Sequence, residues 1–246
     1  MNGLLLIHAF PLDARMWEPQ IAAFDASGIA VVAPHLPGFG GTQGGGDVMT
    51  MGLAAERCLA ELDAADVDRA VVCGLSMGGY VAFELWRRAR QRVAGLMLAN
   101  TRAEADAPEG VANRRALAER LVREGNVLVA NPPPLLSADA SDDLWGRVRE
   151  LIADQPAASI AAASLGMAER PDSSGDLAGI DVPTLVVTSE GDTLIPPEVT
   201  APIADRIPGA VLETIQKAGH LSNLQAPEEF DRLLEEHVAR CLPAGS

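Results

Sequence analysis

The stretch VVCGLSMGGYVAFELW, residues 71–86, places a serine between an apolar run and a helical pattern. The run before the serine is continuous and β-branched, which predicts a buried strand, and the residues from Met77 onward have helical spacing. Between them, GLSMG fits the pattern G-x-S-x-G, in which glycines relieve crowding at a tight strand-to-helix turn. A chain with 23 glycines can produce such a string by chance, but the flanking strand and helix exclude most accidental matches. Ser76 is therefore predicted to be a nucleophile in a strained backbone conformation.

Short apolar runs alternate with helical patterns along most of the chain. The predicted strands are residues 4–8, 29–34, 70–74, 93–99, 183–189 and 210–215. The predicted helices among them are residues 17–26, 50–65, 77–90, 197–207 and 227–241. This alternation predicts an α/β fold, with a mostly parallel sheet and helices on both faces.

One long segment breaks the alternation. It has no convincing strand and contains three successive helical patterns, at residues 113–124, 141–153 and 156–168. The prolines of NPPP, residues 131–134, cannot continue a helix, so the segment must bend there. We expect a core domain of residues 1–101 and 180–246 and a helical cap of residues 102–179.

Composition narrows the possible partners and compartment. A net charge of −15, with no block of basic residues, argues against nucleic acid and anionic membrane surfaces as partners. The cysteines, Cys58, Cys73 and Cys241, lack the spacing of a disulfide framework or a zinc site, and we expect reduced, buried thiols. The first residues lack the basic and apolar regions of a signal peptide, so we expect a cytoplasmic protein.

A serine nucleophile requires a neighbouring base, and the chain has four histidines. His220 follows the last predicted strand, where a loop at the carboxyl edge of the sheet could bring it over Ser76, and it is the expected base. His8 and His35 are interpreted as structural histidines, and His237, among charged helical neighbours, as a solvated one.

The carboxylate that orients the base is expected from the segment EGDTLIPPE, residues 190–198. Asp192 is favoured because it lies beyond the predicted strand. Glu190 could still belong to the strand end, and Glu198 would begin the next helix, where a carboxylate suits the helix dipole. The alternative for Asp192 is a purely turn-forming role beside a glycine.

Attack by the serine would create an oxyanion that needs backbone donors. The amide of Met77 directly follows the nucleophile at a helix N-terminus. The second donor should come from the loop HAFPLD, where Pro11 leaves the amide of Phe10 as the candidate.

Apolar residues in the cap and at the strand ends are candidates to line a substrate pocket, although each could equally belong to the core. They are Phe10, Met77, Trp145, Met167, Leu194, Ile195 and Leu221. Four arginines could face a substrate carboxylate, or could form a solvated helix face paired to Glu119 and Glu124; they are Arg114, Arg115, Arg120 and Arg123.

Five ordered motifs resemble those of the α/β-hydrolase family over nearly the full chain. They are HAFPLD (8–13), HLPGFG (35–40), GLSMGG (74–79), EGDTLIPPE (190–198) and AGHLSNLQAPEEF (218–230). The resemblance implies the triad Ser76, Asp192 and His220, which the residues above suggest independently. Ala9 replaces the usual glycine and His35 the usual aspartate, and either change could shift the oxyanion loop.

The chain begins at what is normally the third strand of that family, so we expect about six strands without the opening hairpin. An exposed edge of this sheet should be blunted or paired, which leaves a monomer or a homodimer open. The dehalogenases and epoxide hydrolases that resemble this fold use an aspartate nucleophile, whereas a serine favours acyl chemistry.

The resulting hypothesis is a carboxylesterase that cleaves small esters through an acyl-serine intermediate, with no metal and no organic cofactor. Within the same family, a lactonase of the 3-oxoadipate enol-lactone kind is the near alternative, and a perhydrolase activity is a further one. A non-catalytic ligand-binding scaffold is the alternative from another class, because a fold alone does not fix function.

Overall fold

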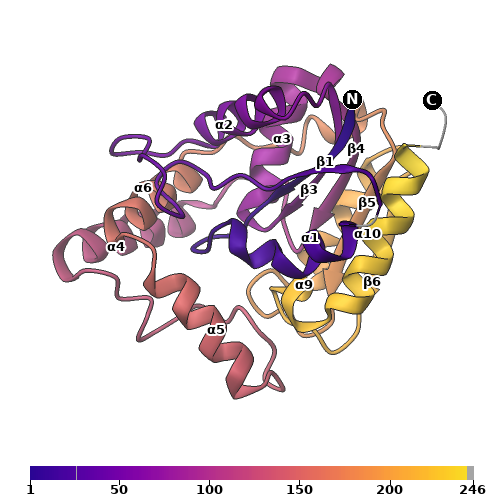
Figure 1. Ribbon diagram of the computed structural model, residues 1–246. Helices are drawn as coiled ribbons and strands as arrows, with labels where there is room; N and C mark the ends of the chain where they lie inside the picture. Colours follow the sequence, from indigo (N-terminus) through magenta and orange to yellow (C-terminus); the bar gives the residue numbers. More distant parts are fainter. Residues whose placement is uncertain (26, 243–246) are drawn as a thin grey trace.

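The computed structural model describes residues 1–25 and 27–242 and contains one sheet with helices around it (Figure 1). The sheet has six strands in the order β2-β1-β3-β4-β5-β6, and every neighbouring pair is parallel. The predicted α/β fold with about six strands is confirmed. The strands are β1 (Asn2–Ile7), β2 (Ala30–Val32), β3 (Arg69–Leu75), β4 (Val93–Ala99), β5 (Thr184–Ser189) and β6 (Val211–Ile215).

Helices cover both faces because the strand order reverses direction at β1. Crossovers between parallel strands are right-handed, so the connection from β1 to β2 and the connection from β2 to β3 lie on opposite faces. Accordingly α1 packs against α10, whereas α2 packs against α3. These helices are α1 (Glu18–Phe24), α2 (Met51–Ala64), α3 (Met77–Ala89) and α10 (Pro227–Cys241).

Two helical predictions differ from the structure near the C-terminal strands. The pattern over residues 197–207 forms two short helices, α7 (Pro197–Thr200) and α8 (Pro202–Arg206), because Pro202 lacks the amide donor that a continuous helix needs. The four-residue helix α9 (Ser222–Gln225) was not predicted, since it is too short to show a period. The predicted helix 17–26 begins as a 3₁₀ turn, and its last residue, Ala26, lies outside the described residues.

Three helices lie between β4 and β5 and form a segment to one side of the sheet (Figure 1). They are α4 (Pro108–Glu124), α5 (Asp142–Ala153) and α6 (Ala157–Ala168), and together we call them the helical insert. Helix α4 begins at Pro108 rather than at residue 113, since proline is well suited to a first helical position. The NPPP segment separates α4 from α5 as predicted.

The central strands are buried except at the first residues of β1 and β3, Asn2 and Arg69, whereas the two edge strands are short or partly exposed. Strand β2 has only three residues, and β6 alternates between partly buried and exposed side chains up to its buried last residue, with Leu212 exposed. Pairing of an edge in a homodimer stays a prediction. Within residues 1–25 and 27–242, no helix combines the length and the apolarity needed to cross a membrane.

The cysteines are unpaired in the part of the chain that the structure describes. Cys58 and Cys73 are buried, and burial raises the pKa of the Cys58 thiol to about 12. Cys241 is only partly buried, so the prediction of three buried thiols is wrong for this residue. It stands in the last turn of α10, where the helix ends near the surface.

Candidate active site

Ser76 occupies a strained turn between β3 and α3. Its backbone has φ 57° and ψ −114°, and its amide donates to the carbonyl of Ala99 at 2.9 Å. A Cβ atom on Gly74 would overlap the carbonyl of Gly78, and one on Gly78 would overlap the carbonyl of Ile7. The predicted strain at Ser76 is therefore confirmed, and both flanking glycines are required by close backbone approach. Strain of this kind costs about 1–3 kcal/mol and is typical of functional sites.

Two backbone amides near Ser76 are candidates for binding an oxyanion. Met77 is the first residue of α3, where the amide has no acceptor within the helix. Phe10 lies in the turn that follows β1, the strand next to β3 in the sheet. Among the described residues, neither amide donates to a backbone carbonyl.

His220 and Asp192 form a buried hydrogen-bonded pair. The Nδ1 atom of His220 lies 2.8 Å from Oδ2 of Asp192, and both side chains are fully buried. The other oxygen of Asp192 accepts hydrogen bonds from the amides of Leu194 and Ile195, each at 2.9 Å. Asp192 therefore bonds both to its own turn and to His220. The turn-forming role and the predicted role as partner of His220 are compatible.

The remaining nitrogen of His220 has no partner. Its Nε2 atom is buried and makes no hydrogen bond within residues 1–25 and 27–242. With Nδ1 donating to Asp192, the neutral ring presents Nε2 as a proton acceptor. A buried acceptor without a partner is costly, which is consistent with a site reserved for chemistry.

Asn100, which the sequence analysis did not single out, supports Asp192 from the end of β4. Its Nδ2 atom donates to Oδ2 of Asp192 at 2.9 Å, and its Oδ1 atom accepts from the hydroxyl of Ser222 at 2.8 Å. Its backbone has φ 46°, and its amide donates to the carbonyl of Val187. The only sequence signal was a polar residue directly after a buried strand.

Thr101, the residue after Asn100, contacts the turn that contains Ser76. The hydroxyl of Thr101 donates to the carbonyl of Ser76 at 2.8 Å. Residues 99–101 thus bond to the Ser76 turn on one side and to the Asp192–His220 pair on the other. The end of β4 is the physical link between the two halves of the candidate site.

The two glutamates considered with Asp192 have other surroundings. Glu190 is exposed, directly follows β5 and accepts a hydrogen bond from the amide of Lys217 at 3.3 Å. Glu198 lies in the first turn of α7, as predicted. Neither hydrogen bonds to His220.

The other three histidines have distinct environments. Burial lowers the pKa of His8 to about 4, and its Nε2 atom accepts from the amide of Leu36 at 3.1 Å. The Nδ1 atom of His35 accepts from the amide of Ala14 at 3.3 Å. Both contacts fit structural roles.

The interpretation of His237 as solvated is wrong. This residue is buried, and burial, with a smaller effect of Arg240, lowers its pKa to about 4. The charged neighbours Glu235, Glu236 and Arg240 are themselves exposed. His237 shares the buried face with Phe230 and Leu233, at helical spacing.

A cavity of about 210 Å³ opens beside Ser76. Four of the predicted pocket residues line it, together with residues from the end of β4 and from the helical insert. The lining residues are Phe10, Ser76, Tyr80, Arg102, Arg114, Leu117, Pro133, Met167, Leu194 and Ile195.

Three residues proposed for the pocket do not line this cavity. Met77, at the start of α3, and Leu221, just before α9, are fully buried. Trp145 packs against the edge of the core and lies near the guanidinium of Arg149, with 5.4 Å between that group and the ring centre. Apolar character alone did not distinguish pocket from core at these positions.

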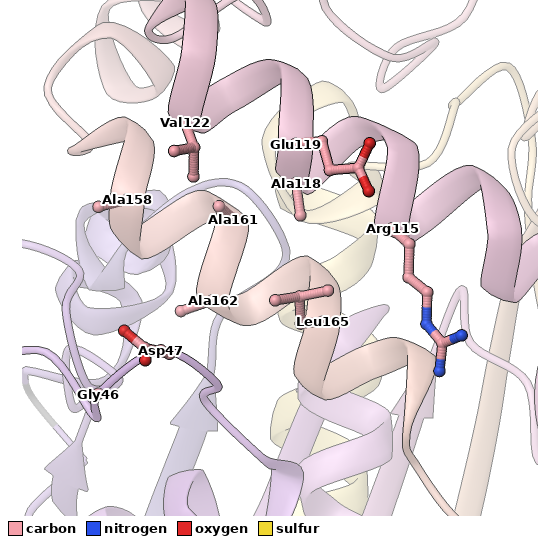
Figure 2. A pocket seen from close by; sticks show the side chains of 10 residues that line it. All are labelled: Gly46, Asp47, Arg115, Ala118, Glu119, Val122, Ala158, Ala161, Ala162 and Leu165. Atoms are coloured by element: carbon pink, nitrogen blue, oxygen red, sulfur yellow. The ribbon is translucent and has the colours of Figure 1, made fainter.

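A second hollow, of about 600 Å³, lies on the helical insert between α4, α6 and Gly46–Asp47 (Figure 2). Small side chains line it, among them Ala158, Ala161 and Ala162 of α6 and Ala118 of α4 (Figure 2). No candidate catalytic residue lines this hollow. Among the described residues, no group of three or more His, Cys, Asp or Glu side chains is arranged to hold a metal ion.

Comparison with known proteins agrees with the fold. The sequence profile of the alpha/beta hydrolase family matches residues 4–233. The chain therefore belongs to the alpha/beta hydrolase family.

Relatives named as esterases and as an enol-lactonase are similar to this chain. A pimeloyl-[acyl-carrier protein] methyl ester esterase from Aromatoleum aromaticum is 29% identical and aligns over 96% of this chain and 97% of its own length. The 3-oxoadipate enol-lactonase 1 of Acinetobacter baylyi is 30% identical over 96% of this chain and 88% of its own. Among solved structures, a thermophilic esterase from Thermogutta terrifontis, with malate bound, has a TM-score of 0.92 and 38% identity over 98% of this chain and 90% of that one.

Proposed function

We propose that the protein is a carboxylic ester hydrolase with Ser76 as nucleophile, His220 as base and Asp192 as the group that orients the base. The observation that carries the proposal is the buried His220–Asp192 pair, 2.8 Å apart, with an unpartnered Nε2 on the same ring. The strained, glycine-flanked turn at Ser76 supports it, as do the esterases among the relatives.

In this mechanism the hydroxyl of Ser76 loses its proton to Nε2 of His220 as its oxygen bonds to the ester carbonyl carbon. The amides of Met77 and Phe10 stabilise the oxyanion, and the buried carboxylate of Asp192 stabilises the imidazolium. The carbon–oxygen bond to the alcohol then breaks, and the alcohol leaves with the proton from His220. Water, deprotonated by the same nitrogen, hydrolyses the acyl-serine and restores the enzyme.

The helical insert is proposed to act as the cap of this site, within the boundaries expected from the sequence. Leu117 and Met167 of the insert line the cavity that also contains Ser76. Substrate size would then be limited jointly by the insert and by the loops at the strand ends.

Hydrolysis of p-nitrophenyl esters of increasing acyl length, by the wild type and by Ser76→Ala, tests the proposal. The variant should lose a factor of about 10³ or more in kcat, because the acyl intermediate can no longer form. Ser27→Ala is the matched control. Ser27 is exposed and precedes β2, at the amino ends of the parallel strands, whereas Ser76 follows the carboxyl end of β3. Equal rates for the wild type and Ser76→Ala would exclude this serine as the nucleophile.

A lactone panel in the same assay addresses the second candidate function. The enol-lactonase relative, at 30% identity over nearly the whole chain, favours including it. The same three residues can open a lactone, in which the leaving alcohol stays attached to the acyl group. The ratio of kcat/KM values between lactones and open esters decides between the two substrate classes.

A further inference from the structure

The cavity beside Ser76 combines an apolar wall with two arginines. Arg102 follows β4 directly after Thr101, whose hydroxyl bonds to the carbonyl of Ser76. Arg114 comes from α4 and lines the same cavity. A small apolar ester would interact with neither guanidinium. The presence of both arginines in the lining therefore suggests a ligand that carries a polar or charged group.

Arg102 lacks the partners that other arginines near the cavity have. It is half-buried, and it forms no ion pair and no side-chain hydrogen bond within residues 1–25 and 27–242. Its Nε atom is buried and unpartnered. Because a guanidinium stays charged and loses hydration on burial, such a position is unfavourable without an anion.

The neighbouring carboxylate is already used. Asp106 forms ion pairs with Arg114 through one oxygen and with Arg170 through the other. Burial alone would raise the pKa of Asp106. Hydrogen bonds from Arg170 and Arg114 outweigh that effect and lower the pKa to about 2, so this carboxylate stays ionised. Both oxygens of Asp106 are therefore engaged, by Arg114 and by Arg170, and neither oxygen pairs with Arg102.

Other carboxylates near this cluster are also engaged. Asp172 is exposed and accepts hydrogen bonds from the amides of Ser174 and Ala105. Glu104 is exposed and lies 3.9 Å from Arg206. Neither forms an ion pair with Arg102, so in a protein of net charge −15 this guanidinium has no ion-pair partner among residues 1–25 and 27–242.

We infer that Arg102 binds a carboxylate carried by the substrate, and that the enzyme acts on small esters that have a carboxylate a few carbons from the scissile carbonyl. The inference rests on the proposed function. A planar guanidinium can bind both oxygens of a carboxylate, which fixes the substrate as well as attracting it. A cavity of about 210 Å³ lies at the small end of ligand sites, which favours a substrate with a short chain.

Matched pairs of small esters test this specificity. Monomethyl glutarate carries the charge on the acyl part, and its neutral isostere is the corresponding primary amide. The pair formed by 4-acetoxybutanoate and its amide carries the group on the alcohol part. The wild type should prefer the anionic member of at least one pair by about 10- to 100-fold in kcat/KM, the usual range for a hydrogen bond to a charged group.

Substitution of Arg102 should remove that preference. In Arg102→Gln the ratio of anionic to neutral kcat/KM should fall at least tenfold, and Arg102→Lys should retain part of it, since lysine keeps the charge without the planar fork. Arg115→Gln is the matched control, because Arg115 lies on α4 but lines the other hollow (Figure 2). Its ratio should equal that of the wild type.

Calorimetric binding of glutarate to Ser76→Ala, with and without Arg102→Gln, separates this inference from the proposed function. If esters are hydrolysed with no preference for the anionic member of either pair, the carboxylate site is wrong and the esterase proposal stands. If no ester is hydrolysed but glutarate binding depends on Arg102, the anion site stands and the esterase proposal fails. Equal glutarate binding with and without Arg102 also overturns the site.

Discussion

Asn100 has no catalytic chemistry of its own, yet it contacts the group that orients His220. Its side-chain amide donates to Asp192, and its carbonyl oxygen accepts from Ser222, so its orientation is set from both ends. All of these side chains are buried. A buried carboxylate that loses one donor is left partly unsatisfied, which changes both its position and its energy.

Asn100→Ala should therefore lower kcat for ester hydrolysis by about tenfold while KM changes little, because it alters the orientation of the base rather than substrate contacts. It should also lower the free energy of unfolding by about 1–3 kcal/mol. Steady-state kinetics and urea unfolding measure the two effects. Ser222→Ala, which leaves the bond from Asn100 to Asp192 in place, should reduce kcat less. Equal kcat values for Asn100→Ala and the wild type would contradict the positioning role.

At the level of elements, the helical insert is attached to the core by close backbone contact. The amide of Met49 donates to the carbonyl of Ala162 in α6 at 3.0 Å, and a Cβ atom on Gly166 would overlap the carbonyl of Met49. The buried side chain of Gln155, just before α6, bonds to Asp13 at 2.7 Å. Helix α6 is thus held against the segment that precedes α2.

Two glycine substitutions within the insert should have opposite effects. Gly166→Ala should lower the free energy of unfolding by about 1–3 kcal/mol, because α6 must move away from Met49. Gly146→Ala, in α5, meets nothing within 4 Å and should stabilise the protein by about 0.5–1 kcal/mol through helix propensity. Thermal and urea unfolding of both variants measure the difference. If Gly166→Ala proved as stable as Gly146→Ala, the close contact between α6 and the core would be refuted.

Across the whole molecule, buried histidines make stability depend on pH. Burial lowers the pKa values of His8 and His237 to about 4, whereas the unfolded values lie near 6.5. Between these values the unfolded chain binds the protons and the folded chain does not. Stability is therefore fully present above about pH 6.5 and is lost as the pH falls toward 4.

His237→Asn should make the free energy of unfolding fall less steeply between pH 6.5 and pH 4, by at most about 1.4 kcal/mol per pH unit for one group. Urea unfolding at intervals of half a pH unit gives the slopes. His35→Asn is the comparison variant, because a third of the His35 side chain is exposed. An unchanged slope in His237→Asn would show that this histidine does not contribute to the acid sensitivity.

Local patterns in the chain were sufficient for the order of elements and for the turn at Ser76. A strand, a glycine-flanked serine and a helix are contiguous in GLSMGG and its flanks, so their conformation follows from adjacent residues. The same holds for β4 and α10, which match their predicted ranges, and for the bend at NPPP. Periodicity could not locate α9 or divide α7 from α8, because helices of four or five residues contain little more than one turn.

Contacts between distant segments decided the rest. Nothing in the sequence distinguishes Arg102 from Arg114. In the structure Asp106 binds Arg114, whereas Arg102 has no such partner. Asn100 became part of the site because β4 ends beside β5, and His237 became buried because its face of α10 packs on the sheet. Burial and pairing depend on residues that the fold brings together, and no neighbouring residue along the chain carries that information.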